Sequence, residues 1–348
     1  MSLPAIPLSF LDLSPVGEGR TAEQAVAATL DLARAVDELG FTRYWLAEHH
    51  GMPGIASSAP AVLIGAVAAA TPRIRVGSGG VMLPNHPPLV VAEQFGTLAA
   101  LHPGRIDLGL GRAPGTDPTT AAALRRTVDP LSADDFPQQL VELVAYLDGA
   151  SNGTVRAVPN AAQRPPVWLL GSSGYSAQLA GMLGLPFAFA HHFSPDNTLP
   201  ALELYRRHFA PSDVLDEPYA VVAAQVLCGE TDEEAELLAQ PSLLSWVRLR
   251  QGRPGPLPSP QSCEAHDWSD LERAIVAERI RGQALGGPER VRAQLGELID
   301  ATRADELMIT TTAYEQADRV ASVRRTRALF GTAPLPEGLA ASRTAATA

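Results

Sequence analysis

Two histidines and a glutamate follow an apolar segment near the N-terminus of the chain. In the run Arg43-Tyr-Trp-Leu-Ala-Glu48-His49-His50, the polar residues are followed by a turn rich in glycine and proline. An imidazole titrates near neutral pH and can take up or return a proton, and a neighbouring carboxylate can orient it. The same residues would also serve as a strand cap that hydrogen-bonds nearby backbone. His49 is therefore a candidate for proton transfer, and the rest of the chain decides between the two interpretations.

A glycine-rich run, Gly77-Ser78-Gly79-Gly80, interrupts a segment that otherwise has the pattern of a regular strand. Glycine weakens the interior of a strand, so its presence indicates a bulge or a ligand that approaches the backbone closely. Tight packing against a neighbouring helix is the alternative.

Two further segments have features of a phosphate site. Arg112 ends the run Gly109-Leu-Gly-Arg112, where paired N–H donors of its guanidinium could bind a phosphate; an ordinary surface ion pair is the alternative. The run differs from a dinucleotide fingerprint because Pro114 occupies the third glycine position, and the chain has no GK[ST] phosphate loop.

The second segment, residues 171–176, joins a predicted strand to a predicted helix. Free N–H groups at a helix N-terminus bind anions, and hydroxyl groups add to such a site. Simple capping of the helix by Ser173 or Ser176 is the alternative. The candidate residues of this loop are Ser172, Ser173, Gly174, Tyr175 and Ser176.

A metal hydrolase is the rival for a histidine-rich chain of this kind. Such barrels typically carry an H-x-H pair on the first strand and an aspartate on the last, whereas here the first strand has no histidine and the last ends in threonines. An H-E-x-x-H helix and a G-x-S-x-G elbow are also missing from the sequence. We therefore expect no metal. His86, in a rigid proline-flanked turn, is a structural histidine unless a ligand lies near it.

These residues lie at the ends of predicted strands that alternate with helices. The strands are expected at residues 7–13, 41–47, 74–83, 106–111, 167–171, 187–193, 221–228 and 306–312. Helices are expected at 22–39, 58–70, 88–101, 136–147, 175–183, 197–209, 271–283, 288–301 and 317–330, with Thr21 and Gln24 in capping-box spacing before the first. A further helix begins after Thr231.

Eight evenly spaced βα units favour an α/β fold of the (β/α)8 TIM-barrel type over a doubly wound sheet. Residues 112–135 and the proline-rich residues 251–261 are expected to be irregular insertions at the rim. We expect one domain over residues 1–334 and a disordered tail over residues 335–348.

The composition excludes several classes of function. The chain has 348 residues and a net charge of −11, with no basic block for a nucleic acid. Cys228 and Cys263 are the only cysteines, which argues against a disulfide scaffold. With no transmembrane segment or signal peptide in the pattern, we expect a cytoplasmic protein that binds neither nucleic acid nor membrane.

Taken in order, the motifs resemble those of the bacterial luciferase-like flavin monooxygenases, in particular a single-subunit branch that carries AEHHGMPGIASSAP. The resemblance extends over residues 43–193 and is weaker at 8–15 and 306–312. It implies a luciferase-like barrel with a flavin at its C-terminal mouth and, commonly, a homodimer. We expect residues 58–70 and 90–101 to form much of the dimer interface.

The resemblance also assigns roles to residues. His49 matches the catalytic histidine, and Gly79-Gly80 match a pair joined by a cis peptide under the flavin ring. Arg112 matches the phosphate-binding arginine and residues 172–176 the phosphate loop, although serines and Tyr175 replace an acidic residue and a threonine there. His86 matches a histidine near the substrate. Glu48 and Ser78 complete the expected cofactor site.

The activity implied is that of a two-component monooxygenase. A separate reductase would supply FMNH2, and one oxygen atom from O2 would pass to a small organic substrate, as in hydroxylations and epoxidations of antibiotic biosynthesis. An F420-dependent oxidoreductase with the same fold is the alternative, and a flavin-binding protein without turnover is a third.

Overall fold

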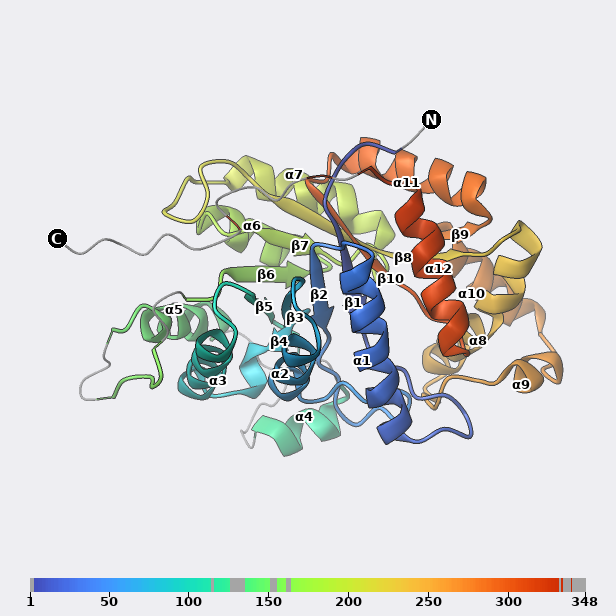
Figure 1. Ribbon diagram of the computed structural model, residues 1–348, viewed down its shortest axis with the longest axis horizontal. Coiled ribbons are helices and arrows are strands. Elements are labelled where there is room, and N and C mark those ends of the chain that lie inside the picture. The colour runs from blue at the N-terminus through green and yellow to red at the C-terminus, as the bar shows by residue number, and fades with distance from the viewer. Residues whose placement is uncertain are drawn as a thin grey trace.

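The computed structural model describes residues 3–113, 116–125, 135–150, 155–160, 164–331, 333 and 339. Runs of two to nine residues form ten parallel strands in this part of the chain, and helices surround them (Figure 1). The strands are β1 (Leu8–Asp12), β2 (Arg43–Leu46), β3 (Arg75–Ser78), β4 (Val81–Met82), β5 (Ile106–Gly111), β6 (Val167–Gly171), β7 (Phe187–Phe189), β8 (Ala220–Cys228), β9 (Gln283–Gly286) and β10 (Glu306–Thr310).

Eight of these strands close into a barrel, in the order β1-β2-β3-β5-β6-β7-β8-β10, with β10 pairing back onto β1. The predicted (β/α)8 TIM barrel is therefore confirmed. The two additional strands are short. β4 pairs with the end of β5, and β9 pairs with the C-terminal half of β8.

The helices follow the strands in the expected alternation. They are α1 (Ala22–Glu38), α2 (Pro60–Ala70), α3 (Pro88–Leu101), α4 (Pro118–Arg125), α5 (Phe136–Leu147), α6 (Gly174–Met182), α7 (Thr198–His208), α8 (Asp232–Arg250), α9 (Pro260–Glu264), α10 (Asp270–Arg281), α11 (Pro288–Thr302) and α12 (Gln316–Ala328), with 3-10 turns η1 (Leu83–Asn85) and η2 (Pro195–Asn197). The capping box of Thr21 and Gln24 forms as predicted. None of the helices described is long and apolar enough to cross a membrane.

Five details differ from the expected elements. The strand expected at 74–83 ends at Ser78 and resumes at Val81, because the intervening glycines are poor strand formers. The strand expected at 187–193 ends at Phe189. Residues 112–135 contain α4, and α9 begins at Pro260 within the expected loop. The helix expected at 271–283 ends at Arg281, since pairing with β8 makes the next four residues a strand.

The barrel interior holds a buried ion-pair network beneath the mouth. Nη1 of Arg43 on β2 lies 2.8 Å from Oδ2 of Asp107 on β5, and Nε of Arg43 lies 3.1 Å from Oε1 of Glu306 on β10. Arg75 on β3 also pairs with Asp107. These side chains are almost fully buried, so each charge needs its partner to offset the loss of hydration. The network joins four strands of the wall, β2, β3, β5 and β10. The tail expected to be disordered lies outside the described residues except for Leu339, which is buried in an apolar cluster of the barrel.

Candidate active site

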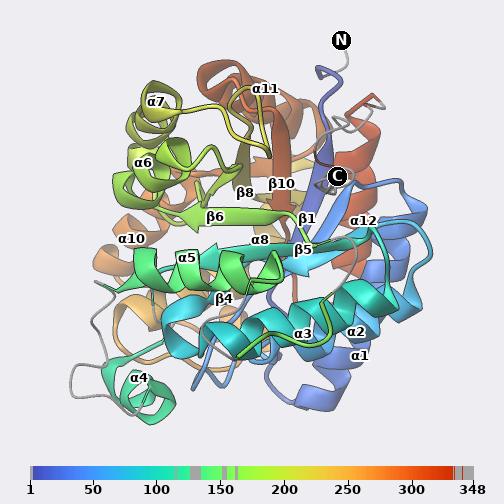
Figure 2. The ribbon, with the colours of Figure 1, turned by 90° about the vertical axis from the view of Figure 1, so that its left-hand side faces the viewer.

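The parallel register brings the predicted site residues to one end of the barrel. Glu48 and His49 follow β2, Ser78 ends β3, Arg112 follows β5 and Ser172 follows β6. Because these strands pair in parallel around the wall, all of their C-terminal ends open at the same mouth. Figure 2 shows the arrow of β6 pointing to the side of the molecule where α4 and α10 lie.

Glu48 is the centre of a hydrogen-bonded cluster at this mouth. One oxygen, Oε1, accepts a hydrogen bond from Nε2 of His50 and another from Nε2 of His86, both at 2.8 Å. The backbone N–H of Met82 and the side-chain amide of Asn85 donate to the same carboxylate. Burial raises the pKa of Glu48, but the hydrogen bonds from the two histidines outweigh burial and lower it to about 2. The carboxylate is therefore ionised at neutral pH and fixes both imidazoles with Nε2 as the donor.

The ligand atoms of Glu48, His50 and His86 lie within 4.8 Å of one another, a spacing that a cation could bridge. Both imidazoles already donate to the carboxylate, so the described residues satisfy this cluster without an ion.

His49 faces a different environment from its neighbour His50. Its backbone N–H donates to the carbonyl of Ser57 at 3.0 Å, and the Ser57 hydroxyl donates to the carbonyl of Ala47, which fixes the loop. Its side-chain Nδ1 is buried and has no hydrogen-bond partner in the described part of the chain. Burial lowers the pKa of His49, only partly opposed by the charge of Glu48. The ring is therefore neutral at pH 7, with a free nitrogen.

The glycines at the end of β3 allow this strand to approach β5 unusually closely. Ser78 Oγ donates to the carbonyl of Gly109 at 2.8 Å and accepts from its N–H at 3.0 Å. A Cβ on Gly109 would lie 2.1 Å from the Ser78 carbonyl oxygen, and one on Gly80 would lie 2.7 Å from that of Gly109. The peptide between Gly79 and Gly80 is cis, as the family resemblance implied. Close packing of strands, and not of a helix, thus requires these glycines.

Arg112 and the start of α6 form a cationic corner of the mouth. The guanidinium carbon of Arg112 lies 4.2 Å from the centre of the Tyr175 ring, in the first turn of α6. Ser173 is the N-cap residue, but its side chain makes no capping hydrogen bond. Among the described residues Arg112 forms no ion pair, so the structure does not show the surface salt bridge that was the alternative for Arg112. Nor does it show the helix cap that was the alternative for Ser173. Gly174 begins the helix, and Ser176 is buried within it.

Two further residues, His192 after β7 and Arg279 on α10, were not among the predicted site residues. His192, at the end of the β7 segment, has its Nδ1–H 2.9 Å from the carbonyl of Ala223, and burial lowers its pKa to about 4. Burial is the largest cause of this lowering, and electrostatic repulsion from Arg279, His191 and His49 adds to it. Arg279, on α10, donates to the backbone carbonyl of His192. The double histidine after a predicted strand is a sequence signal for His192, whereas Arg279 has none.

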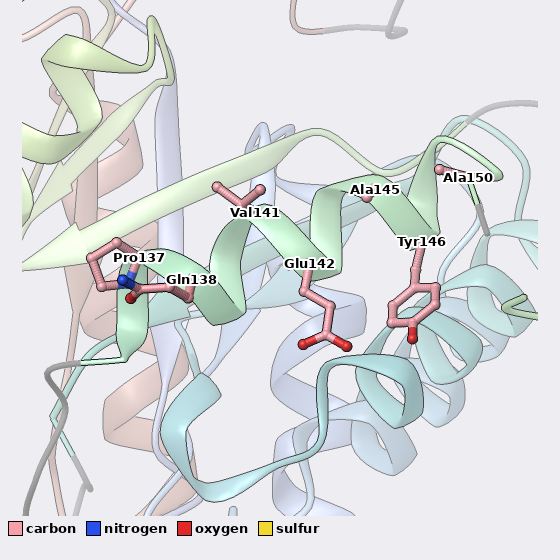
Figure 3. Close-up of a pocket in the computed structure, with 7 residues that line it drawn as sticks. All are labelled: Pro137, Gln138, Val141, Glu142, Ala145, Tyr146 and Ala150. Atoms are coloured by element: carbon pink, nitrogen blue, oxygen red, sulfur yellow. The ribbon is translucent and has the colours of Figure 1, made fainter. Parts of the chain in front are cut away.

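Two cavities lined by described residues lie outside this cluster. The larger, of about 610 Å³, is an open groove along α5, with Val141 on one side of the helix and Glu142 and Tyr146 on the other (Figure 3). The second, of about 270 Å³, lies at the mouth between the loops that follow β1 and β10, where Arg20 lies over the ring of Tyr314. Neither cavity is lined by His49 or Arg112.

Comparison with known proteins identifies close relatives over nearly the whole chain. An uncharacterized protein of Bacillus subtilis, YvbT, is 54% identical over 90% of this chain and 94% of its own length. A luciferase-like monooxygenase of Escherichia coli K12 is 48% identical over 91% of this chain and 95% of its own length. An N-acetyl-S-alkylcysteine monooxygenase of Bacillus subtilis is 35% identical over 88% and 92%.

Solved structures share the fold. The crystal structure of apo-MsnO8 matches with a TM-score of 0.87 at 39% identity and covers 95% of this chain and all of that one. Structures below 25% identity, which show the fold alone, include a Baeyer–Villiger monooxygenase component with FMN (TM-score 0.71, covering 92% of this chain and 96% of that one) and an F420-dependent alcohol dehydrogenase (0.66, covering 92% and 98%). The profile of the luciferase-like monooxygenases matches residues 6–306. The chain therefore belongs to the luciferase-like monooxygenase family and is an oxidoreductase of that kind.

Proposed function

We propose that this protein is an FMNH2-dependent, two-component monooxygenase that transfers one oxygen atom from O2 to a small organic substrate. The observation that carries the proposal is the cationic corner formed by Arg112 and the N-terminus of α6. It combines a guanidinium that has no carboxylate partner in the described residues with helix N–H groups to which the side chain of the N-cap residue, Ser173, does not bond. This donor set suits a phosphate monoester such as that of FMN.

The residues present fit a flavin mononucleotide. Arg112 would bind the phosphate, together with the backbone N–H groups and hydroxyls of residues 172–176, which stand at the same strand end. Gly79 and Gly80, which pack against Leu11 and the backbone of Gly109, would border the flat ring. Glu48 and His86 would border the site through their fixed hydrogen bonds.

Bound reduced flavin supplies the activation of O2, and a separate reductase would deliver it in the reduced state. His49 would take up or return a proton at its imidazole, which is neutral at pH 7 and is not hydrogen-bonded to Glu48. His50 and His86 keep Nε2 directed at Glu48, so they would line the site and not exchange that proton.

An F420-dependent hydride transfer is the second candidate, since an F420-dependent alcohol dehydrogenase shares the fold. A flavin-binding protein without turnover is the third. The oxygen transfer could take the form of a hydroxylation, an epoxidation or a Baeyer–Villiger oxidation. The relative that acts on N-acetyl-S-alkylcysteine makes sulfur compounds worth including in a substrate screen.

Replacement of Arg112 tests the phosphate site. In Arg112→Ala, we expect the affinity for FMN to fall by about 10- to 100-fold, because a charge-assisted hydrogen bond contributes roughly 1.5–3 kcal/mol. Riboflavin, which has no phosphate, should bind within about two-fold of wild type by the same argument. Quenching of flavin fluorescence on titration measures both affinities. Arg34→Ala, on the exposed face of α1, is the control. Equal losses for FMN and riboflavin would show that Arg112 does not bind the phosphate.

A further inference from the structure

Arg279 occupies an unusual position on the rim of the mouth. It lies on α10, at the end of the barrel where the site residues converge (Figure 2). Its guanidinium carbon is 4.1 Å from the centre of the Trp246 ring on α8. Nη1 donates to the backbone carbonyl of His192, three residues after β7. The side chain is therefore held from two sides and cannot turn freely into solvent.

The charge of Arg279 is not balanced by the described residues. None of their ion pairs includes it, and burial lowers its pKa to about 10 with no carboxylate to oppose this shift. The deeply buried arginines Arg43, Arg75 and Arg319 each pair with a carboxylate. A half-buried cation without a counter-ion costs free energy, so an arginine in this state commonly has an anionic partner.

Arg279 also keeps most of its hydrogen-bonding capacity. A guanidinium has five N–H donors, and Arg279 uses one of them on a described residue. Arg105, which likewise forms no ion pair in the described part of the chain, donates four hydrogen bonds to carbonyl and hydroxyl oxygens. Hydrogen bonds within the protein therefore account for the unpaired charge of Arg105. Arg279 has only one such bond to the described residues and keeps N–H donors for a ligand.

The surroundings of Arg279 combine a cation with apolar surface. The ring of Phe193 lies 5.0 Å from that of His192, and 52% of Phe193 is exposed. The indole of Trp246 completes this face. An organic molecule with an anionic head and an apolar body matches both features.

We propose that Arg279 binds the anionic group of the organic substrate, and that the substrate class is therefore carboxylate-bearing compounds with an apolar body. The proposal rests on the proposed monooxygenase function and adds the chemistry of its substrate. Arg112 and α6, which follow β5 and β6, would serve the flavin phosphate, whereas Arg279 stands beside β7 and β8. Two separate cationic positions thus serve two separate anions.

The test uses octanoate and phenylacetate as probes, each with its primary amide as the uncharged counterpart. Quenching of intrinsic tryptophan fluorescence reports binding, because Trp246 is in contact with Arg279. The proteins are wild type, Arg279→Gln, Arg279→Lys and, as a control on the same helix, the exposed Arg281→Gln. Circular dichroism confirms that each variant is folded, and FMN affinity is measured on each.

In wild type and Arg281→Gln, we expect at least one carboxylate to bind about 10-fold or more tightly than its amide. Arg279→Gln should lose about 10- to 100-fold in carboxylate affinity and little in amide affinity, and Arg279→Lys should retain binding within about five-fold. FMN affinity should be unchanged in all variants. No preference for carboxylates in wild type would overturn the proposal. Loss of FMN affinity in Arg279→Gln would overturn it too, and would assign Arg279 to the flavin. Absence of FMN binding in wild type would instead contradict the proposed function, while the carboxylate preference would stand or fall separately.

Discussion

At the scale of single residues, the structure separates His49 from the histidines around it. Glu48 engages both His50 and His86 through Nε2, whereas Nδ1 of His49 is buried without a partner among the described residues. A ring that is hydrogen-bonded to an ionised carboxylate is held in place, whereas the His49 ring has no such hydrogen bond. From this difference we propose that His49 transfers the proton, whereas His50 and His86 line the site.

His49→Ala should therefore lower product formation by about 100-fold or more, as expected for loss of a general acid–base group. FMNH2 affinity should stay within a few-fold, since His49 is distant in the chain and on the barrel wall from the α6 phosphate corner. Product, hydrogen peroxide and oxygen uptake are measured together with chemically reduced FMN. The control is His102→Ala, at the opposite end of the barrel before β5. Unchanged turnover in His49→Ala would make this histidine a strand cap.

The lowered pKa of His49 gives the pH dependence a sign. Burial favours the neutral ring, so the reactive form persists below the ordinary imidazole value of about 6.5 and is lost only as the pH falls through the lowered pKa. The acid limb of kcat/KM should thus lie below pH 6.5 in wild type and be missing from the residual activity of His49→Ala. An acid limb at or above pH 6.5 would contradict the assignment.

Glu48 makes a separate prediction about stability. Its pKa falls from 4.5 to about 2 on folding, so the ionised carboxylate contributes stability that is complete above pH 4.5 and is lost as the pH falls towards 2. The contribution is up to roughly 3 kcal/mol at neutral pH. Urea unfolding of wild type and Glu48→Gln should show a difference that shrinks between pH 6 and pH 3. A difference independent of pH would mean that Glu48 is not ionised in the folded protein.

At the scale of elements, the contact of β3 with β5 depends on the absence of a side chain. A Cβ at Gly109 would stand 2.1 Å from the Ser78 carbonyl oxygen, which is backbone and cannot move aside cheaply. Gly109→Ala should therefore lower the free energy of unfolding by about 1–3 kcal/mol or prevent folding. Gly255→Ala, where a Cβ meets nothing within 4 Å, should be neutral. Denaturant unfolding measures both, and equal effects would show that the strands are not held this closely.

The elements also show what could be predicted from the sequence. Hydrophobic periodicity predicted that the eight barrel strands exist, because each is a short continuous run of buried residues. Periodicity and the capping box together predicted α1. β9 was missed since its four residues directly follow a helical pattern and acquire strand geometry only by pairing with β8. Arg279 was missed for a similar reason: an arginine on a polar helix has no local pattern, and its role depends on Trp246 and His192, which are distant in the sequence.

At the scale of the whole molecule, two neighbouring helices expose apolar side chains. Val62 on α2 is 72% exposed and Leu101 on α3 is 66% exposed, and Figure 2 shows these helices side by side on one flank of the barrel. We predict that this flank forms a homodimer interface, since burial of apolar surface favours association. Light scattering should give a dimer at micromolar concentration.

Val62→Asp combined with Leu101→Asp should shift the protein towards monomer, because each places a charge in the interface. Leu271→Asp, at an equally exposed leucine on α10, should leave the mass unchanged. A wild-type monomer, or an effect of the α10 variant as large as that of the double variant, would contradict the predicted interface.

The central claim is that the mouth holds reduced FMN and uses it with O2. The most direct measurement titrates the wild-type protein anaerobically with FMNH2 and, separately, with reduced F420, and then admits oxygen while uptake is recorded in the presence of a substrate panel. The account predicts micromolar binding of FMNH2, weaker binding of reduced F420, and a product that contains one atom of ¹⁸O from labelled O2. Binding of F420 in preference to FMN, with substrate oxidised by hydride transfer and no ¹⁸O in the product, would contradict it.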